Sequence, residues 1–355
     1  MKEHIKYTVA GLMSGTSVDG LDICISEFWK QDDRWQYKIL IAFTKAYPFE
    51  LKEKLVNVSK MSAEEVIVIE QEFSKFISEN INSILHEYGL KIDFIASHGH
   101  TVFHNPKQFY TYQIGNGEQI AKTTGIPVVC DFRRGDVALG GQGAPLVPIG
   151  DLHLFSKYKA CLNLGGFSNI SYQSNTGKRI AYDISPLNIL LNKYSRMKGE
   201  EYDEFGKMAE SGEIIPDLLN QLNSLNYYKL LPPKSLAIEW VNQQVVPILE
   251  KYEDLKVEDI LCTLTNNMAG IISQNLDSHS NVLITGGGAY NKYLISLIRK
   301  STTCELVIPD ELTIDFKEAL VFAFLGVLRW CDEINILASV TGASRNSSGG
   351  IVCFP

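Results

Sequence analysis

An α/β fold in two domains is the class that the sequence predicts, on three observations. The chain has 355 residues, and at roughly 150 residues per domain this length suits two domains. Segments with strand-like alternation and segments with helical spacing follow one another, which is typical of α/β proteins. A strand, a glycine turn and a second strand occur near the N-terminus and again about 150 residues later, which hints at a duplicated fold.

The first half of the chain has clear local signals. Strands are expected at residues 6–11 and 21–26, joined as a β-hairpin by a glycine-rich turn. Ser62 and Glu65 have the spacing of a capping box, so a long helix should begin there and end at Gly89. Further elements are expected as a strand at 92–96, a helix at 118–124 closed by Gly125, and a strand at 127–132.

A stretch rich in glycine and proline, residues 133–151, shows no periodicity and is expected to be a structured loop that crosses between domains. The N-terminal domain should comprise residues 1–135 with a C-terminal tail of about 335–355, and the C-terminal domain residues 136–334. In the second half, strands are predicted at 160–164, 169–173, 282–285 and 306–309, and helices at 186–197, 257–276, 290–300 and 317–331.

Composition excludes several classes of protein. Hydrophobic residues make up 45% and charged residues 21%, as in globular proteins. With 41 acidic and 33 basic residues the formal charge is −8, so neither nucleic acid nor an anionic membrane is an expected partner. The seven cysteines are widely spaced and no secretory signal is apparent, which favours a reducing cytoplasm. The ten-residue apolar run 319–328 is too short to span a bilayer and indicates a buried helix.

Three glycine-rich turns each follow a predicted strand: Gly15-Thr16-Ser17 with Asp19-Gly20, then Gly165-Gly166, then Gly286-Gly287-Gly288. Glycine lets backbone amides approach an anion closely, so such turns can bind phosphate. None of them has the Walker A or the Rossmann pattern. Each could also simply link two strands, but three together favour a phosphate site built from hairpin turns.

The first turn adds side chains to this site. The hydroxyls of Thr16 and Ser17 lie beside the amides, and Asp19 could hold Mg²⁺ through water. Asp19-Gly20 is equally typical of an ordinary hairpin turn.

The string SHGHTVFH brings His98, His100 and His104 close together. On an extended strand His98 and His100 should share a face, but no acidic or thiol ligand has suitable spacing for zinc. Polar positioning of a ligand just after a strand is the favoured interpretation.

Asp183 ends a predicted strand and precedes a helix. It could be the base that activates a hydroxyl or water in phosphoryl transfer, or it could cap the helix, and its position favours neither. Arg133 and Arg134, followed by Asp136, could hold a phosphate or carboxylate, or form a surface ion pair.

Taken in order, several strings resemble one known family, the 1,6-anhydro-N-acetylmuramic acid kinases of bacteria. They span the chain and are GLMSGTSVDGLD (11–22), SHGHTVFH (97–104), DFRRGD with GGQGAPLVP (131–148), NLGGFSNI (163–170), YDISPLN (182–188), LPPKS (231–235), TGGGAYN (285–291) and TGASR (341–345). MSGTSxDG and GGQGAPLVP are the most specific of them.

The resemblance implies a two-domain actin/hexokinase-like (ribonuclease H-like) fold with ATP in a central cleft between the domains. It also implies a reaction in which ATP phosphorylates O6 of the anhydro sugar while water opens the 1,6-anhydro bridge. The products are N-acetylmuramate 6-phosphate and ADP, formed during peptidoglycan recycling in the cytoplasm. A Mg²⁺ ion and a homodimer are implied as well.

The resemblance also assigns roles to residues. Asp183 matches the catalytic aspartate, which takes a proton from the water that attacks C1. His100, Arg133 and Glu318 are implied on the substrate side. The ATP-binding residues implied are Ser14, Gly15, Thr16, Ser17, Val18, Asp19, Gly20 and Leu21 in the first turn, Gly165 and Gly166 in the second, and Gly286, Gly287 and Gly288 on the nucleoside side.

The chain departs from the family pattern at a few positions. Ile184 and Ser185 replace a threonine and a glycine beside the catalytic aspartate, and His100 replaces a common glutamine. Ala237 and Ile238 stand where Gly-Arg is common. These departures leave two alternatives open, a kinase of the same fold for another sugar and a non-catalytic module that senses ATP or sugar.

Overall fold

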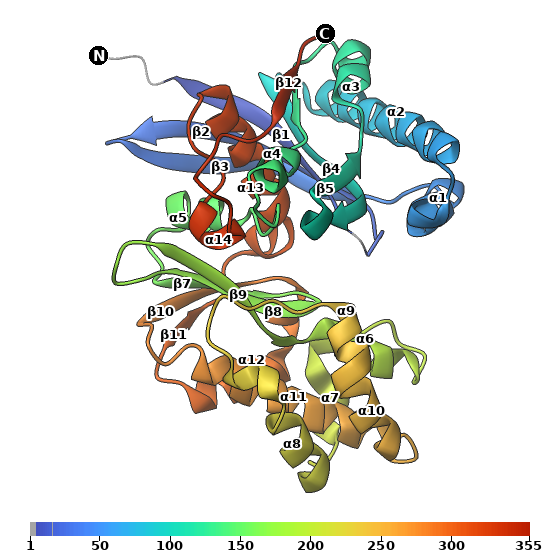
Figure 1. The fold of residues 1–355 in the computed structure, drawn as a ribbon, viewed down its shortest axis with the longest axis vertical. Coiled ribbons are helices and arrows are strands. Elements are labelled where there is room, and N and C mark those ends of the chain that lie inside the picture. The colour runs from blue at the N-terminus through green and yellow to red at the C-terminus, as the bar shows by residue number, and fades with distance from the viewer. Residues whose placement is uncertain (1–4, 16) are drawn as a thin grey trace. The chain divides into compact units, whose positions relative to one another are not determined.

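The structure, a computed structural model, describes residues 5–15 and 17–355 (Figure 1). The chain divides into two compact units. Unit 1 comprises the chain up to Leu154 together with Phe316–Pro355, and unit 2 comprises Phe155–Asp315. Each has its own sheet and hydrophobic core.

The sheet of unit 1 has the strand order β12-β6-β4-β1-β2-β3, with β5 paired to β4. β1 is antiparallel to β2, β2 is antiparallel to β3, and β4 and β6 continue the sheet in parallel with β1. The strands are β1 (Lys6–Ser14), β2 (Leu21–Gln31), β3 (Arg34–Lys45), β4 (Phe94–Asn105), β5 (Tyr110–Ile114), β6 (Val128–Cys130) and β12 (Ile351–Cys353). The predicted hairpin is confirmed.

The sheet of unit 2 repeats this arrangement with the order β11-β10-β7-β8-β9. Its strands are β7 (Ala160–Leu164), β8 (Phe167–Gln173), β9 (Arg179–Pro186), β10 (Asn281–Thr285) and β11 (Glu305–Val307). β7, β8 and β9 form an antiparallel meander, and β10 and β11 run parallel to β7. Both sheets therefore place the first strand between the second and the fourth. This shared topology confirms the α/β class and explains the repeated hairpin in the sequence.

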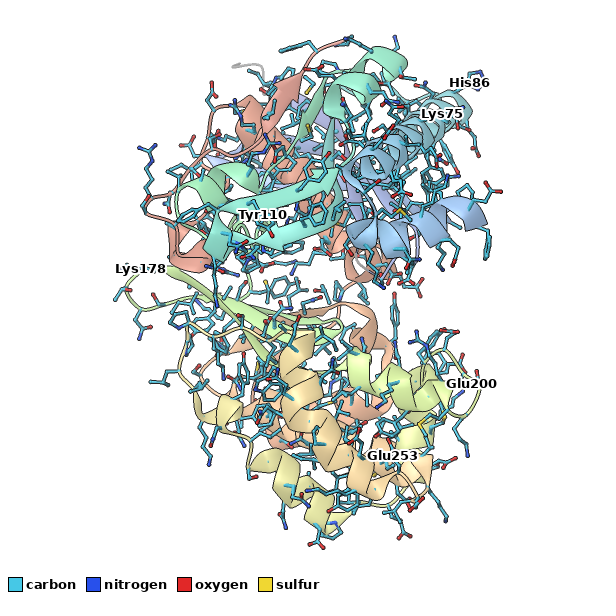
Figure 2. The ribbon with its side chains drawn as sticks, turned by 45° about the vertical axis from the view of Figure 1, so that its right-hand side comes forward. Lys75, His86, Tyr110, Lys178, Glu200 and Glu253 are labelled. Atoms are coloured by element: carbon cyan, nitrogen blue, oxygen red, sulfur yellow. The ribbon has the colours of Figure 1, made fainter. Side chains whose placement is uncertain are left out.

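One face of the unit 1 sheet is covered by α2 (Ala63–Tyr88). The capping box is present, since the Ser62 side chain accepts from the Glu65 amide while the Glu65 carboxylate accepts from the Ser62 amide, and Gly89 ends the helix in the left-handed conformation. The apolar face of α2, which includes Phe73, packs in one cluster with Ala10 and Leu12 of β1. Its outer face carries polar residues such as Lys75 and His86 (Figure 2).

The opposite face of this sheet is covered by α13 (Glu311–Trp330). Gly11 alternates with Ala10 and Leu12 along β1 and so faces the other way. A Cβ at Gly11 would lie 2.8 Å from the Cβ of Ala323, and one at Gly326 would lie 2.6 Å from the Cβ of Ala96. Glycine at these points lets the helix approach the sheet closely.

The division into units differs from the expected domain boundaries, which were 1–135 with about 335–355 for one domain and 136–334 for the other. The structure divides the chain after Leu154 and after Asp315 instead. The physical reason is that the apolar run of α13 packs on β1 and β4, so most of the helix expected in the C-terminal domain belongs to unit 1. The stretch expected as a loop also differs, since it contains α4 (Arg134–Ala138) and α5 (Pro148–His153). Helices this short have too few turns to show periodicity.

The remaining helices lie close to their predicted ranges or in the region without prediction. Unit 1 also contains α1 (Phe49–Asn57), α3 (Gly117–Thr124) and α14 (Ala338–Thr341). Unit 2 contains α6 (Asn188–Arg196), α7 (Lys207–Ser211), α8 (Pro216–Asn223), α9 (Ile238–Trp240), α10 (Val246–Leu249), α11 (Val257–Gln274) and α12 (Lys292–Ser301). Among the described residues, none of these helices combines the length and apolar character needed to span a bilayer.

Candidate active site

The first glycine turn joins β1 to β2 in unit 1. Ser14 is 2% exposed, and its hydroxyl accepts from the Tyr47 hydroxyl at 2.7 Å and lies 2.9 Å from Nδ1 of His100. Burial lowers the pKa of His100, while the backbone of Leu55 opposes this change. Because the Ser14 hydroxyl accepts from Tyr47, its own proton is available to Nδ1 of His100. His100 is thus buried behind the turn and holds Ser14 in place.

The tip of this turn has an unusual backbone. Val18 is buried with φ of 54°, a conformation that a β-branched residue rarely adopts, and its amide donates to the Gly15 carbonyl at 3.2 Å. Such strain is often found at functional segments. Gly20 has a negative φ, so Asp19-Gly20 is not the two-residue turn considered as the alternative.

The side chains of the turn have different exposures. Ser17 and Asp19 are exposed, Leu21 is buried, and a Cβ at Gly20 would lie 2.5 Å from Thr44. Thr16 lies outside the described residues. The turn therefore presents the side chains of Ser17 and Asp19 to solvent.

A bulge in β4 separates two of the histidines. Gly99 has φ of 75°, and the register between β1 and β4 shifts between Leu12 and Ser14. The ring centroid of His98 then lies 4.7 Å from that of Phe322 of α13, whereas the ring centroid of His100 lies 6.3 Å from that of Phe73 of α2. The expectation that both share a face is wrong, because the bulge reverses the alternation of the strand.

Arg133 is held by two of its own donors. Its Nε donates to Nε2 of His98 at 2.9 Å, and its Nη1 donates to the Gly143 carbonyl at 2.6 Å. Its neighbour Arg134 forms the surface ion pair instead, with Asp131 at 2.8 Å. The ion-pair interpretation therefore holds for Arg134, and ligand binding by Arg133 stays a prediction. The third candidate, Asp136, is buried and accepts from Gly143 and Thr341.

Arg133 and Glu318 interact electrostatically. Burial lowers the pKa of Arg133 to about 10, while Glu318 opposes that change. Part of the Glu318 side chain is exposed to solvent. The protein around its carboxylate raises the pKa of Glu318 by desolvation. The charge of Asp22 raises this pKa further, whereas the charge of Arg133 lowers it. The structure thus brings together two of the three residues expected on the substrate side.

The second and third glycine turns lie side by side in unit 2. Gly286 has φ of 82°, and a Cβ there would lie 2.6 Å from Oδ1 of Asn163. A Cβ at Gly288 would lie 2.8 Å from that of Leu164. Only glycine allows the turn after β10 to pack this closely on the end of β7.

Both turns also have an open side. A Cβ at Gly166 would meet nothing within 4 Å, and one at Gly287 would meet only Asn188, at 3.9 Å. Beside them, the Thr285 hydroxyl is buried without a hydrogen bond to any described residue. Space next to exposed backbone and an unused hydroxyl fits a nucleotide phosphate or ribose.

Asp183 lies on β9, opposite Asn169 of β8. Its Oδ2 accepts from the Leu236 amide at 2.8 Å and its main-chain carbonyl accepts from the Tyr227 hydroxyl at 2.7 Å. Oδ1 forms no hydrogen bond with the described residues. Burial raises the pKa of Asp183, although the Leu236 amide opposes this. The capping alternative is wrong, since α6 begins at Asn188 with Leu187 as its N-cap.

Residue-by-residue reasoning missed the partners of Asp183. Tyr227 and Leu236 lie 44 and 53 residues further along the chain. Lys234 of the LPPKS string lies 4.8 Å above the Tyr227 ring and so supports this arrangement. The LPPKS string was the signal in the sequence that could have pointed to this segment, but no rule of residue spacing connects it to Asp183.

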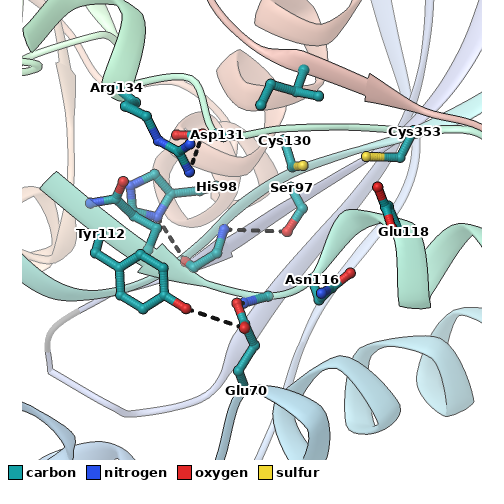
Figure 3. Close-up of a pocket in the computed structure, with 14 residues that line it drawn as sticks. Glu70, Ser97, His98, Tyr112, Asn116, Glu118, Cys130, Asp131, Arg134 and Cys353 are labelled. Carbon is teal, nitrogen blue, oxygen red and sulfur yellow. Dashed lines mark hydrogen bonds and ion pairs between the residues drawn. The ribbon is translucent and has the colours of Figure 1, made fainter. Parts of the chain in front are cut away.

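A separate cavity of about 330 Å³ opens in unit 1 beside the β4 bulge (Figure 3). Among its charged groups, Arg134 pairs with Asp131 and Glu70 accepts from the Tyr112 hydroxyl, and Glu118 also lines the cavity. None of the residues expected to bind ATP or sugar lines it.

One family model matches almost the entire chain. The family model described as anhydro-N-acetylmuramic acid kinase matches residues 7–355. The chain belongs to the anhydro-N-acetylmuramic acid kinase family. An anhydro-N-acetylmuramic acid kinase of Aliivibrio fischeri is 34% identical, covering 96% of this chain and 98% of its own. An anhydro-N-acetylmuramic acid kinase of Crocosphaera subtropica is 33% identical, and the match covers 97% of this chain and 98% of the relative. One of Pseudomonas syringae pv. tomato is 34% identical, and the match covers 89% of this chain and 90% of the relative.

Solved structures share only a distant likeness with this kinase family member. Component A of (R)-2-hydroxyglutaryl-CoA dehydratase from Acidaminococcus fermentans has a TM-score of 0.45 at 11% identity and covers 89% of this chain and 96% of its own. A ROK family protein from Streptococcus pneumoniae in complex with sucrose has a TM-score of 0.36 at 11% identity, and the match covers 91% of this chain and 100% of that protein.

Proposed function

We propose that this chain transfers the γ-phosphoryl group of ATP to O6 of 1,6-anhydro-N-acetylmuramic acid while water opens the anhydro bridge. The products are N-acetylmuramate 6-phosphate and ADP, and the reaction serves cell-wall recycling. The observation that carries the proposal is Asp183, a half-buried carboxylate with one oxygen anchored and the other unused, in a chain of this family.

Asp183 is the general base. The Leu236 amide and the Tyr227 hydroxyl fix the residue at both its side chain and its backbone, so Oδ1 can accept a proton from the water that attacks C1. A raised pKa makes the carboxylate a stronger base than an ordinary aspartate. As the C1–O6 bond breaks, O6 becomes the nucleophile for phosphoryl transfer.

The glycine turns bind the nucleotide. ATP, when bound, would supply the phosphoryl group, and the exposed backbone at Gly166 and Gly287 in unit 2 offers room for its phosphates. Exposed Asp19 would hold Mg²⁺ through water. The described residues contain no group of three His, Cys, Asp or Glu side chains suited to a metal.

Arg133 and Glu318 bind the sugar. The anchored guanidinium keeps three N–H donors free of the two bonds described above, which suits the carboxylate and oxygens of a muramic acid. His100 is buried and bonds to Ser14, so it supports the first turn and does not contact the sugar directly.

The departures beside Asp183 do not argue for another sugar. Ile184 is fully buried in the unit 2 core, and Ser185 bonds to Ser168 at 2.8 Å in the interior of the hairpin. Both side chains are therefore buried and already packed or hydrogen-bonded inside unit 2. A change of substrate would need to act elsewhere, for example at Ile238.

Mass spectrometry of the product formed in isotopically labelled water tests this proposal. Wild type should add one phosphoryl group and one labelled oxygen at C1, and Asp183→Asn should lose about 100- to 10,000-fold in rate. Asp254→Asn, on an exposed aspartate of the same unit, is the matched control and should behave as wild type. Absence of turnover with this sugar would refute the proposal.

The resemblance also supports three broader proposals, a homodimer, a cytoplasmic location and no nucleic-acid partner. Sedimentation at several concentrations tests the first. Cell fractionation and a filter-binding assay with DNA and RNA test the other two.

A further inference from the structure

We propose that His98 is a positioning residue that sets the orientation of the Arg133 guanidinium toward the sugar. The inference rests on the proposed function, in which Arg133 contacts the substrate. No motif assigns this role to His98, which at the sequence level was considered only for zinc or general ligand positioning.

The two ring nitrogens of His98 have different partners. Nδ1 lies 2.9 Å from the Gly99 carbonyl, and a carbonyl can only accept, so Nδ1 carries the proton. Nε2 of the neutral ring then has a free lone pair, which accepts the Nε–H of Arg133 at 2.9 Å. The Gly99 carbonyl therefore selects the tautomer that can hold the arginine.

The bond from His98 fixes a direction as well as a position. Guanidinium is planar, and its Nε and Nη1 are held by His98 and by the Gly143 carbonyl. Two anchors in one plane determine how the remaining N–H groups point. Without His98, Arg133 would keep only the bond to Gly143 and could rotate about it.

His98 is itself rigidly placed. The ring is 4% exposed and packs against Phe322, and the Gly99 bulge directs it to this side of the sheet. A Cβ at Gly99 would lie 2.5 Å from the Ile114 carbonyl oxygen, so the bulge requires glycine. Burial and the nearby Arg133 lower the pKa of His98, so the ring stays neutral, as the acceptor role needs.

The test compares His98→Leu with His98→Gln in steady-state kinetics of the full chain. His98→Leu removes the acceptor and should lower kcat/KM for the anhydro sugar by about 10- to 100-fold, the value of a hydrogen bond to a charged group. The KM for ATP should change by less than about twofold. In His98→Gln the amide oxygen can replace Nε2, so most of the loss should be recovered. His86→Leu, on the exposed end of α2, is the matched control and should leave both constants unchanged.

A double-mutant cycle shows whether His98 acts through Arg133. In an Arg133→Ala background, His98→Leu should cause little further loss, because its target is already missing. If the two losses multiply, the proposal is overturned. If His98→Leu does not fold, His98→Asn takes its place, since the shorter amide does not reach Arg133.

The outcomes separate this inference from the proposed function. Wild type without turnover of the sugar refutes the function. Wild type that turns over normally while Arg133→Ala keeps its kcat/KM refutes the sugar contact of Arg133 and with it the positioning role, but leaves the proposed reaction standing. Equal losses in His98→Gln and His98→Leu would also refute it, because they would indicate a packing defect.

Discussion

Replacing Lys317 by methionine should strongly destabilise unit 1. Lys317 of α13 and Asp151 of α5 form an ion pair at 2.7 Å, and their side chains are only 7% and 5% exposed. Methionine has a similar length but no charge, so the substitution leaves the Asp151 carboxylate buried without its cation. Removing one partner of a buried pair typically costs about 3–5 kcal/mol, a large part of the stability of an ordinary domain.

Urea unfolding followed by tryptophan fluorescence measures this effect. Three of the four tryptophans, Trp29, Trp35 and Trp330, lie in unit 1, and Trp240 lies in unit 2. With an m value of about 2 kcal/mol/M, the midpoint of the unit 1 transition should fall by roughly 1.5–2.5 M. The unit 2 transition should not move.

Two variants make the result decisive. Lys75→Met removes an exposed cation, 3.8 Å from Glu79, and should change stability by less than about 0.5 kcal/mol. The double variant Lys317→Met/Asp151→Leu removes both buried charges and should regain most of the loss. A loss in Lys317→Met no larger than that in Lys75→Met would show that water reaches the pair, and the reasoning would fail.

Other predictions concern pH, a cap and a glycine. Because the catalytic form of Asp183 is ionised and its pKa is raised, activity should fall with decreasing pH at a higher pH than for an ordinary aspartate; a pH–rate profile with no acid limb below pH 7 would contradict this. Ser62→Ala should cost about 1 kcal/mol in urea unfolding, since it removes the cap of α2, whereas Ser62→Asp should retain most of the stability. Gly99→Ala should lose both stability and sugar turnover, because alanine meets the Ile114 carbonyl oxygen in a left-handed backbone; near wild-type kcat/KM would count against the bulge requirement.

Much of the fold was accessible from local sequence. The capping box at Ser62 and the left-handed Gly89 delimit α2 through contacts within one or two turns of chain. Alternating side chains predicted the β1–β2 hairpin for the same reason, since each residue needs only its neighbours to show the pattern. The glycine turns were also located this way, because glycine is tied to the turn that carries it. Asp183 was expected at the end of a strand but lies inside β9 (Arg179–Pro186), because hydrogen bonding to β8 extends the strand beyond it.

The tertiary structure decided what depends on register and distant contacts. Strand alternation predicted one face for His98 and His100, but the bulge at Gly99 placed them on opposite faces. The partners of Asp183 come from Tyr227 and Leu236, and no periodicity links segments that far apart.

The assignment of α13 to unit 1 has the same origin. Its apolar residues show that the helix is buried, but only the close approach at Gly11 and Gly326 determines which sheet it covers. Local sequence specifies the period, caps and turns of each element, because those interactions are short in range. Which elements meet, and which side chains then share a site, is set by packing between surfaces that the chain brings together only when it folds.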